Sequence, residues 1–389
     1  MGDIIMSTLD MMNAIFSNQR LEIEEHDISS TKWVSEGLKD EVNKWNLSSY
    51  YKGVYNKKSI LITAPTGSGK STFALKELPK YLDVMFQFHN EADEGILTPA
   101  KPTAIPAQAS GSVLVLSNRS ALNMQQKDIL FKNIKMPAIS SNSLNDINVF
   151  GNIILMTYQE ASTKMRYLHD YIIPVNHIPE IKCIVMDEVH FFVSDATFNA
   201  KTKPILDSIF WTFPDAGRIY ITATPEKVEP LIAYEEYMFA FQNAYRLSID
   251  PYTGHRTESD FQLRTNAKKR KLIKYTFHAS YDYIVPSFFS KWEMIQSLIK
   301  KADPSEKWLI FVSSKEDGQK LQDDLGSLAD YIDADTKSKA PQKLHSIVRM
   351  ERFSARVLIC TSVLDSGFNI KDPDVKHIVI DTLSSVQAR

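Results

Sequence analysis

A run of small residues that ends in a lysine and a serine has the composition of a phosphate-binding loop (P-loop). It follows the apolar residues 59–62 and precedes a helix-prone stretch. Small residues let backbone N–H groups close around phosphate oxygens, and the N-terminus of the next helix adds positive potential. The run predicts a P-loop with alanine in place of the usual first glycine. Its residues are Ala64, Pro65, Thr66, Gly67, Ser68, Gly69, Lys70, Ser71 and Thr72.

Two adjacent carboxylates, Asp187 and Glu188, follow the apolar residues 184–186. Such a pair is usually only the polar start of a loop, but a P-loop on an earlier strand favours a catalytic role. Lys70 would reach the β- and γ-phosphates of ATP, and Ser71 and Asp187 would hold Mg²⁺. Glu188 would orient and deprotonate the attacking water. We therefore predict Lys70, Asp187 and Glu188 as catalytic residues, with ATP and Mg²⁺ as ligands.

Short apolar runs separated by helical or loop segments indicate how these residues are positioned. Runs of this length are typical of strands in a parallel sheet that is covered on both faces, so we predict an α/β domain. A second α/β domain is predicted from three further runs. The first set covers 59–62, 113–116, 152–155, 182–186 and 218–221, and the second covers 308–312, 357–360 and 377–380.

The predicted organisation has four parts. Residues 1–55 form an N-terminal helical segment with helical spacing over 32–45, residues 56–235 the first domain, residues 236–290 a connecting segment, and residues 291–389 a second, incomplete domain. Residues 90–111, rich in Ala, Pro, Gly and Ser, are expected to be a surface insertion.

Composition is that of a globular protein, with 43% hydrophobic and 24% charged residues among 389. No apolar run is long enough to span a bilayer and no secretory signal is visible, so we expect a cytoplasmic protein. Cys183 and Cys360 lie singly in apolar runs, which argues against zinc or a disulfide framework. A net charge of −2 predicts that any nucleic-acid site is a local groove. The basic residues 268–274 favour a solvated helix face over a phosphate track.

Three blocks in their order along the chain resemble the DExH branch of the superfamily 2 helicases. They are the P-loop, the run Asp187-Glu188-Val189-His190, and the run Thr222-Ala223-Thr224-Pro225. The resemblance implies two RecA-like parallel-sheet domains that close on ATP and grip a DNA or RNA backbone. It also implies that His190, Thr222 and Thr224 couple the nucleotide state to nucleic-acid binding.

Looser matches extend the resemblance to other strand ends. Asp365 and Gly367, within 361–369, would face the nucleotide from the second domain. Arg119 and Thr157 could instead be plain helix N-caps. The residues that the resemblance places on the nucleic-acid backbone are Arg119, Thr157, Ser313 and Thr361.

Residues 384–389 resemble the start of the arginine-containing motif VI. Only the start of that motif is seen. An arginine that stabilises the transition state contributes about 10³ to 10⁵ in rate, so without the rest of the motif we expect this chain to bind ATP but to hydrolyse it slowly. Three functions stay open at this point. They are an ATP-driven helicase or translocase, the motor subunit of a restriction, defence or phage system, and an ATP-gated nucleic-acid clamp or scaffold with weak hydrolysis.

Overall fold

The chain forms two compact units in a computed structural model. The first comprises Met1–Asn118 and Ile129–Ala279, and the second comprises Arg119–Asp128 and Ser280–Arg389. No helix among the described residues is long and apolar enough to cross a membrane. The structure describes residues 19–28, 33–45, 59–81, 112–118, 123, 126–127, 130, 148–150, 153–163, 181–194, 202–214, 216–278, 285–336, 341–361 and 370–381.

The first unit is built on an eight-stranded sheet in the order β1-β8-β2-β7-β6-β3-β5-β4. All neighbouring strands are parallel except β4, which runs antiparallel to β5. β2 and β5 are buried along their whole length, as expected of strands covered on both faces. The strands are β1 (Glu22–Ile28), β2 (Ser59–Thr63), β3 (Ser112–Ser117), β4 (Val149–Phe150), β5 (Ile153–Thr157), β6 (Ile181–Met186), β7 (Gly217–Thr222) and β8 (Lys271–Phe277).

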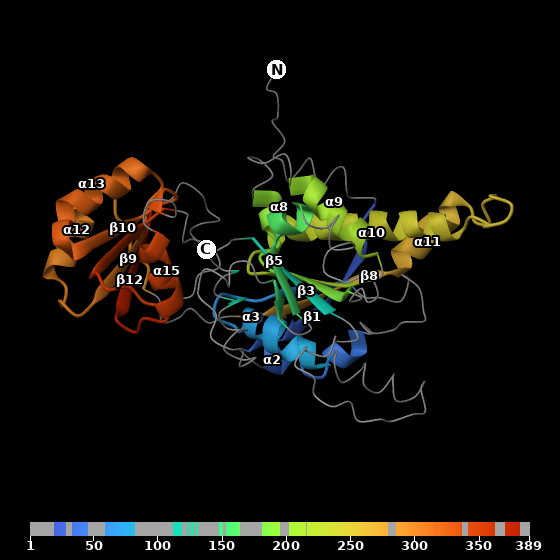
Figure 1. The fold of residues 1–389 in the computed structure, drawn as a ribbon, viewed down its shortest axis with the longest axis horizontal. Coiled ribbons are helices and arrows are strands. Elements are labelled where there is room, and N and C mark those ends of the chain that lie inside the picture. Colours follow the sequence, from blue (N-terminus) through green and yellow to red (C-terminus); the bar gives the residue numbers. More distant parts are fainter. Residues whose placement is uncertain are drawn as a thin grey trace, which may run out of the picture. The chain divides into compact units, whose positions relative to one another are not determined.

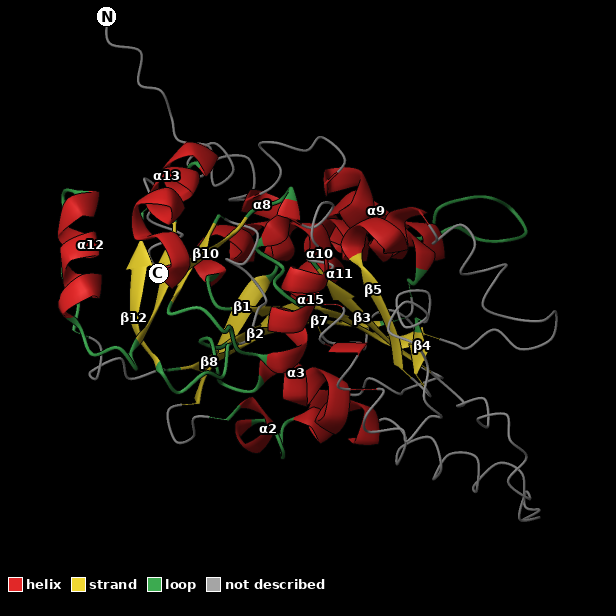
Figure 2. Ribbon diagram, turned by 60° about the vertical axis from the view of Figure 1, so that its left-hand side comes forward, coloured by secondary structure: helices red, strands yellow, loops and turns green. Residues whose placement is uncertain are grey.

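Helices cover both faces of this sheet. Figures 1 and 2 show α8, α9 and α10 on one face and α2 and α3 on the other. Apolar side chains of α9 and α10, among them Ile209 and Ile232, join the main core with Met186 and Tyr220 of the sheet. The helices are α2 (Val34–Gly37), η1 (Val42–Trp45), α3 (Lys70–Thr72) continuing into η3 (Phe73–Glu77), α8 (Phe191–Ser194), α9 (Thr202–Thr212), α10 (Pro225–Leu247) and α11 (Asp260–Lys269).

The second unit has a four-stranded parallel sheet in the order β10-β11-β9-β12. Alternate residues of β9 point to opposite faces, so Trp308 and Ile310 pack with α12 and α13 while Leu309 packs with α15. The elements are α12 (Trp292–Lys301), β9 (Lys307–Phe311), α13 (Lys315–Leu325), η4 (Gly326–Leu328), β10 (Ala329–Ile332), α15 (Pro341–Met350), β11 (Val357–Cys360) and β12 (Val375–Ile380). Two parallel-sheet α/β units are therefore confirmed.

The expected helical segment over residues 1–55 is wrong for residues 22–28, which form β1 at the edge of the first sheet. β1 pairs in parallel with β8, so a strand from the expected connecting segment belongs to the first sheet. The paired strands are complementary in charge. Lys271 of β8 lies 3.6 Å from Glu22 and 3.5 Å from Glu24 of β1, and Lys274 lies 3.1 Å from Glu25.

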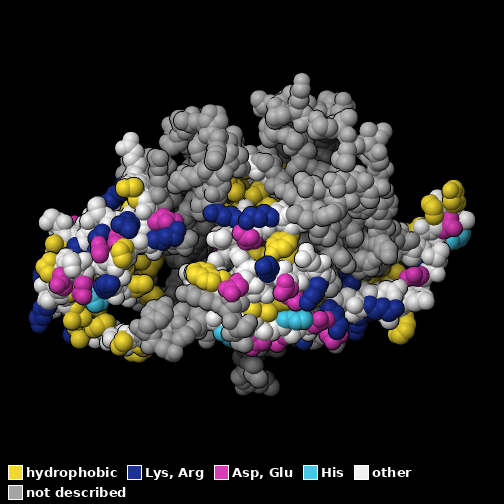
Figure 3. Space-filling view, turned by 90° about the horizontal axis from the view of Figure 1, so that it is seen from below, with side chains coloured by type: hydrophobic (Ala, Val, Ile, Leu, Met, Phe, Trp, Pro, Cys, Tyr) yellow, Lys and Arg dark blue, Asp and Glu magenta, His cyan; other side chains and the backbone are white. Residues whose placement is uncertain are grey.

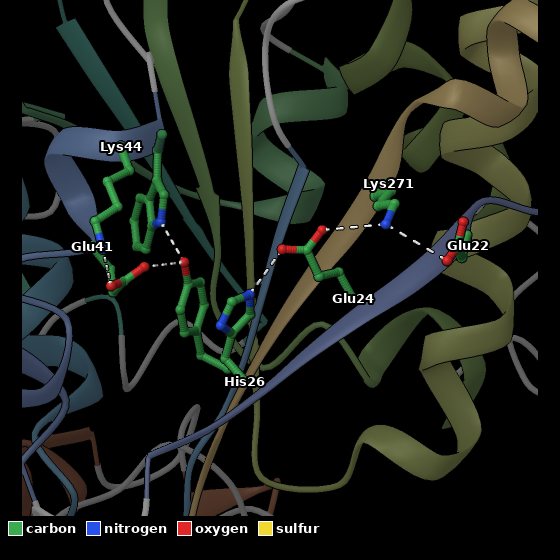
Figure 4. A network of polar contacts seen from close by, with 8 residues as sticks. Glu22, Glu24, His26, Glu41, Lys44 and Lys271 are labelled. Carbon is green, nitrogen blue, oxygen red and sulfur yellow. Dashed lines mark hydrogen bonds and ion pairs between the residues drawn. The ribbon is translucent and has the colours of Figure 1, made fainter.

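Figure 4 shows how this edge continues toward η1. His26 contacts Glu24 at 3.1 Å and stacks on Tyr275, with ring centroids 5.0 Å apart. The Tyr275 hydroxyl donates to Glu41 Oε2 at 3.0 Å and accepts from Trp45 Nε1 at 3.0 Å. The hydrogen bond from Lys44 lowers the pKa of Glu41. These contacts fix β1 and η1 on β8.

The basic cluster at 268–274 is not a single solvated helix face. Lys268 and Lys269 end α11 and are exposed, whereas Arg270 is buried and Lys271 and Lys274 lie in β8. Lys274 contacts Glu229 of α10 at 2.7 Å as well as Glu25. The carboxylates around Lys271 and Lys274 leave these two side chains poorly suited to track phosphates.

A buried ion pair ties α10 to the sheet. Arg218 of β7 donates to Glu236 Oε1 and Oε2 at 2.7 and 2.9 Å, and its guanidinium lies 4.3 Å from the centre of the Phe239 ring. Tyr220 donates to Glu236 at 2.6 Å, and Arg270 lies 3.6 Å from it. Burial by itself would raise the pKa of Glu236, but these donors, Arg218 above all, lower it to about 2.

Replacing Glu236 by glutamine tests this ion pair. The variant leaves Arg218 buried without its counter-ion, so we expect the free energy of unfolding at pH 7 to fall by about 3 kcal/mol. Because the pKa of Glu236 is about 2 in the folded chain and that of an ordinary glutamate is 4.5, this contribution is present above pH 4.5 and is lost as the pH falls toward 2. Urea unfolding monitored by circular dichroism at several pH values measures it.

Glu25→Gln is the matched control, because Glu25 pairs with Lys274 at the exposed edge. Exposed pairs contribute less than about 1 kcal/mol, so its effect is expected to be small. Equal effects of the two substitutions at pH 7 would contradict the assigned role of Glu236.

Candidate active site

The register of the first sheet gathers the predicted motifs at one edge. Thr63 at the end of β2 is level with Thr222 of β7, and Ser117 of β3 is level with Thr157 of β5. Since parallel strands end on the same side, the residues that follow each strand meet there. The Ala64 N–H bonds the Thr222 carbonyl at 3.0 Å, which extends the ladder into the P-loop.

The P-loop takes a shape that requires its glycines. Gly67 and Gly69 have φ angles of +79° and +82°, in the left-handed region that side chains with a Cβ rarely adopt. Ser68 is buried, and its hydroxyl donates to the Pro65 carbonyl at 2.7 Å. The Phe73 N–H bonds the Gly69 carbonyl at 2.9 Å, so the helix that includes Lys70 starts directly at the loop.

Lys70 lies inside the loop and is only 9% exposed. Its ammonium donates to the Ala64 and Pro65 carbonyls at 2.9 and 3.1 Å. Phosphate oxygens would compete with these carbonyls for the three donors of the ammonium. Ser71 and Thr72 follow on the first helical turn, where Ser71 is half-buried and Thr72 is exposed.

Asp187 and Glu188 form a strained turn after β6. Asp187 is buried, its N–H bonds the Leu116 carbonyl at 2.8 Å, and its Oδ1 accepts from the Glu188 N–H at 3.0 Å. Glu188 has a φ of +53°, which is uncommon and costly for a residue with a side chain. Such strain is found chiefly at functional sites.

Tyr158 supports this turn by a hydrogen bond, and sequence reasoning missed it. Its buried hydroxyl donates to the Asp187 carbonyl at 2.8 Å. The ring stacks on Phe191, with centroids 5.4 Å apart and planes 2° from parallel, and contacts the edge of Phe192. A tyrosine directly after Thr157 was the only available signal. Tyr158 thus connects the end of β5 to the acidic turn.

His190 joins the acidic turn to the end of β7. Its Nδ1 lies 3.3 Å from Glu188 Oε2 and 3.3 Å from Thr222 Oγ1. The same hydroxyl oxygen accepts from the Thr224 N–H at 3.1 Å. The structure therefore brings together the three residues expected to couple, in contact with the expected base.

The electrostatics of Glu188 suit a proton acceptor. Burial raises the pKa of its carboxyl, and attraction to the Lys70 ammonium opposes that increase. The net shift is upward, toward the range in which a carboxylate is an effective base near neutral pH. Mg²⁺ prefers oxygen ligands and commonly uses one or two carboxylates together with substrate phosphates. The hydroxyl of Ser71 and the carboxylate of Asp187 fit that donor set.

The expected nucleic-acid residues have other partners in the structure. Thr157 is a helix N-cap, the alternative left open by the sequence: its Oγ1 accepts from the Glu160 N–H at 3.1 Å, and the Glu160 carboxylate accepts from the Thr157 N–H at 2.9 Å. Ser313 donates to Asp381 at 2.8 Å. The N–H of Thr361, which follows β11, bonds the Ile332 carbonyl at 3.2 Å.

Several predicted features lie outside the described residues. They are Arg119, Asp365, Gly367, the insertion at 90–111 and the motif VI-like residues 384–389.

Trp33 is a second residue that sequence reasoning missed, and it lies beside the P-loop. It is 49% exposed, and a Cβ built at Gly69 would lie 3.3 Å from its ring. The next residue, Val34, donates its N–H to the Ser68 carbonyl at 3.0 Å. A half-exposed aromatic ring therefore lies beside the loop. No spacing rule connects it to residues more than thirty positions later.

Glu188→Gln tests whether the buried charge of Glu188 lowers the free energy of unfolding. The pKa of Glu188 in the folded chain lies above the ordinary glutamate value of 4.5, so the folded chain binds more protons over that window and its stability falls as the pH rises through it. The variant avoids this cost. We expect a higher free energy of unfolding than the parent at pH 7, and equal values below pH 4.5, in urea titrations.

Glu293→Gln on α12 is the matched exposed control, for which we expect little change at either pH. If Glu188→Gln is less stable than the parent at pH 7, attraction to nearby cations outweighs the desolvation of the Glu188 carboxylate.

Comparisons with known proteins identify conserved domains in both units. Residues 48–231 match the DEAD/DEAH box helicase family and residues 290–385 match the helicase conserved C-terminal domain. No curated protein matches the chain. Among solved structures, the DEAD-box helicase Mss116 bound to ssRNA and UDP-BeF is 13% identical over 93% of this chain and 72% of that chain, with a TM-score of 0.50.

A second similar structure is S. cerevisiae Dbp5 bound to RNA and ADP BeF3, at 14% identity over 97% of this chain and 78% of that chain, with a TM-score of 0.49. At such identities the likeness concerns the fold, which is RecA-like in both units. With both conserved domains present in order, the chain belongs to superfamily 2 of the helicases.

Proposed function

We propose that the chain is a nucleic-acid-dependent ATPase of the helicase or translocase type. The observation that carries this proposal is the contact of His190 with both Glu188 and Thr222 at the edge where the P-loop begins. The family supports an ATPase that binds nucleic acid. The partner would be a DNA or RNA strand held by its backbone.

In the proposed reaction, the P-loop amides and Lys70 bind the ATP phosphates. Lys70 would exchange its bonds to the Ala64 and Pro65 carbonyls for bonds to phosphate oxygens. Ser71 and Asp187 would hold Mg²⁺, which neutralises developing phosphate charge. Glu188, with its raised pKa, would accept a proton from the attacking water.

Coupling would pass through two hydrogen-bonded routes. One runs from Glu188 through His190 to Thr222 and Thr224, at the start of α10. The other runs from the Asp187 carbonyl through Tyr158 to Thr157, which we propose exchanges its Glu160 cap for a backbone phosphate. The first route would carry a shift at the phosphates to the coupling residues, and the second would carry it to Thr157, which was assigned to nucleic acid.

We also propose that Trp33 stacks on the base of the bound nucleotide. Its half-exposed ring lies beside Gly69, and the backbone of Val34 is bonded to the same loop. A ring held in this position can stack without a hydrogen-bond code, so base selectivity from this contact is expected to be weak.

Lys70→Ala tests the nucleotide site. Because its ammonium is the only side-chain cation that donates into the loop among the described residues, we expect ATP binding and turnover to fall below detection. Lys76→Ala, an exposed lysine on the same helix, is the matched control and is expected to retain both. Retained ATP affinity in Lys70→Ala would disprove the assignment.

The same assay identifies the activity class. ATP turnover is measured with no nucleic acid, single-stranded DNA, duplex DNA and RNA, and we expect stimulation by at least one of them. Turnover that is the same in all four conditions would contradict a motor and favour an ATP-gated clamp or scaffold.

Replacing Trp33 tests the stacking contact. Trp33→Ala is expected to weaken ATP binding about tenfold, whereas Trp33→Phe retains most of the affinity because it keeps an aromatic face. The dissociation constant with a fluorescent ATP analogue measures both, and thermal unfolding checks the fold. Equal affinities of the parent and Trp33→Ala would place the base elsewhere.

A further inference from the structure

A helical hairpin of the first unit ends in a built turn far from the P-loop. α10 and α11 pack against each other, with Ala244, Leu263 and Ala267 buried, and residues 248–259 connect them. Figure 1 shows this end extending away from the sheet. Thr257 donates to the Ser248 carbonyl through both N–H and hydroxyl at 2.7 Å, so the connection is held in place. We call residues 241–269 the hairpin tip.

Large apolar side chains gather on the hairpin tip without a cover. Tyr252 is 96% exposed and Phe261 is 81% exposed, and Tyr245 and Ile249 are exposed as well. Among the described residues of the first unit, the exposed large hydrophobic side chains are these four and Trp33. Hydrophobic surface at the outer end of the hairpin is visible at the right of Figure 3. Such a concentration outside a core indicates an interaction surface.

Positive charge is interleaved with these rings. The Arg256 guanidinium lies 5.4 Å from the centre of the Tyr245 ring, and that of Arg264 lies 5.9 Å from the centre of Phe241. On α11, Phe261, Arg264 and Lys268 are spaced at i, i+3 and i+7, which places them on one helix face.

The carboxylates of the hairpin tip are already engaged within it. Asp250 accepts from the N–H groups of Tyr252 and Thr253 at 2.8 Å, Asp260 bonds Arg256, and Glu258 accepts from Asn266. The hairpin tip holds five cations and three carboxylates, and four of the cations have no carboxylate partner among the described residues. They are Arg246, Arg264, Lys268 and Lys269.

This pattern favours a polyanion with flat rings over a protein surface. The centre of a protein–protein interface is depleted of charged residues, and lysine in particular is rare there. Here exposed cations and exposed aromatic side chains occur on the same segment, and Arg256 and Arg264 contact rings directly. Single-stranded nucleic acid needs both elements, cations along the phosphates and aromatic faces for the bases.

We propose that the hairpin tip is a second contact for single-stranded nucleic acid, in which bases stack on Tyr252 and Phe261 and phosphates pair with Arg264 and Lys268. The proposal rests on the proposed function and adds a site outside the motor edge. α10 begins after Thr224 and has 23 residues, so the tip lies about 34 Å from that edge. A strand must be long enough to contact both.

The test compares the intact chain with Tyr252→Ala/Phe261→Ala and with Arg264→Gln/Lys268→Gln. Affinity for fluorescein-labelled 40-nucleotide oligothymidylate and oligouridylate is measured by anisotropy between 50 and 300 mM salt, together with the concentration that half-stimulates ATP turnover. We expect the aromatic variant to bind about tenfold more weakly. The charge variant should reduce the slope of log affinity against log salt by about 1.4.

Controls make the outcome specific to the hairpin tip. Lys300→Gln/Lys301→Gln removes two exposed cations from α12 and is expected to leave the slope unchanged. All variants should keep the parent's maximal ATP turnover and melting temperature, because none of these side chains is buried.

Unchanged affinity and slope in both tip variants, with the parent still stimulated by the oligonucleotides, would overturn this inference alone. If a bound protein is then recovered only with the unsubstituted tip, the surface belongs to a protein partner. Absence of any oligonucleotide binding or stimulation in the parent would instead overturn the proposed function.

Discussion

The parallel register of the first sheet is the constraint on which the site depends. Strand ends that are level with one another bring residues far apart in the sequence within hydrogen-bond distance, as the Ala64 N–H and the Thr222 carbonyl show. A shift of one residue in β7 would turn Thr222 to the other face and separate it from His190. The chemistry of the site is therefore set by backbone pairing before any catalytic side chain acts.

The buried pair of Arg218 and Glu236 extends that constraint to α10. It fixes the middle of the helix that starts at Thr224 and ends near the hairpin tip. Replacing such a pair with well-packed apolar residues is often neutral, so its presence is better explained by the geometry it imposes than by net stability.

Much of this architecture follows from local patterns, and the rest depends on pairs that are distant in sequence. Continuous apolar runs predict β2, β3, β5, β6 and β7, because strands covered on both faces need no polar side. β1 and β8 are missed because charged side chains interrupt them, acidic in β1 and basic in β8. Each looks like a solvated segment until Glu24 is paired with Lys271. The acidic pair is predicted from its motif. Its left-handed Glu188, its support by Tyr158 and the position of Trp33 arise only from packing.

The pairing of β1 with β8 has a consequence for biosynthesis. Glu25 and Lys274 are 249 positions apart, so the first strand described cannot take its place until most of the chain has left the ribosome. Contacts at such separations close slowly, and unpaired strands are prone to aggregate while they wait. The carboxylates of β1, at Glu22, Glu24, Glu25 and Asp27, repel other copies during that delay. The charges that later bind β1 to its neighbour thus also protect the nascent chain.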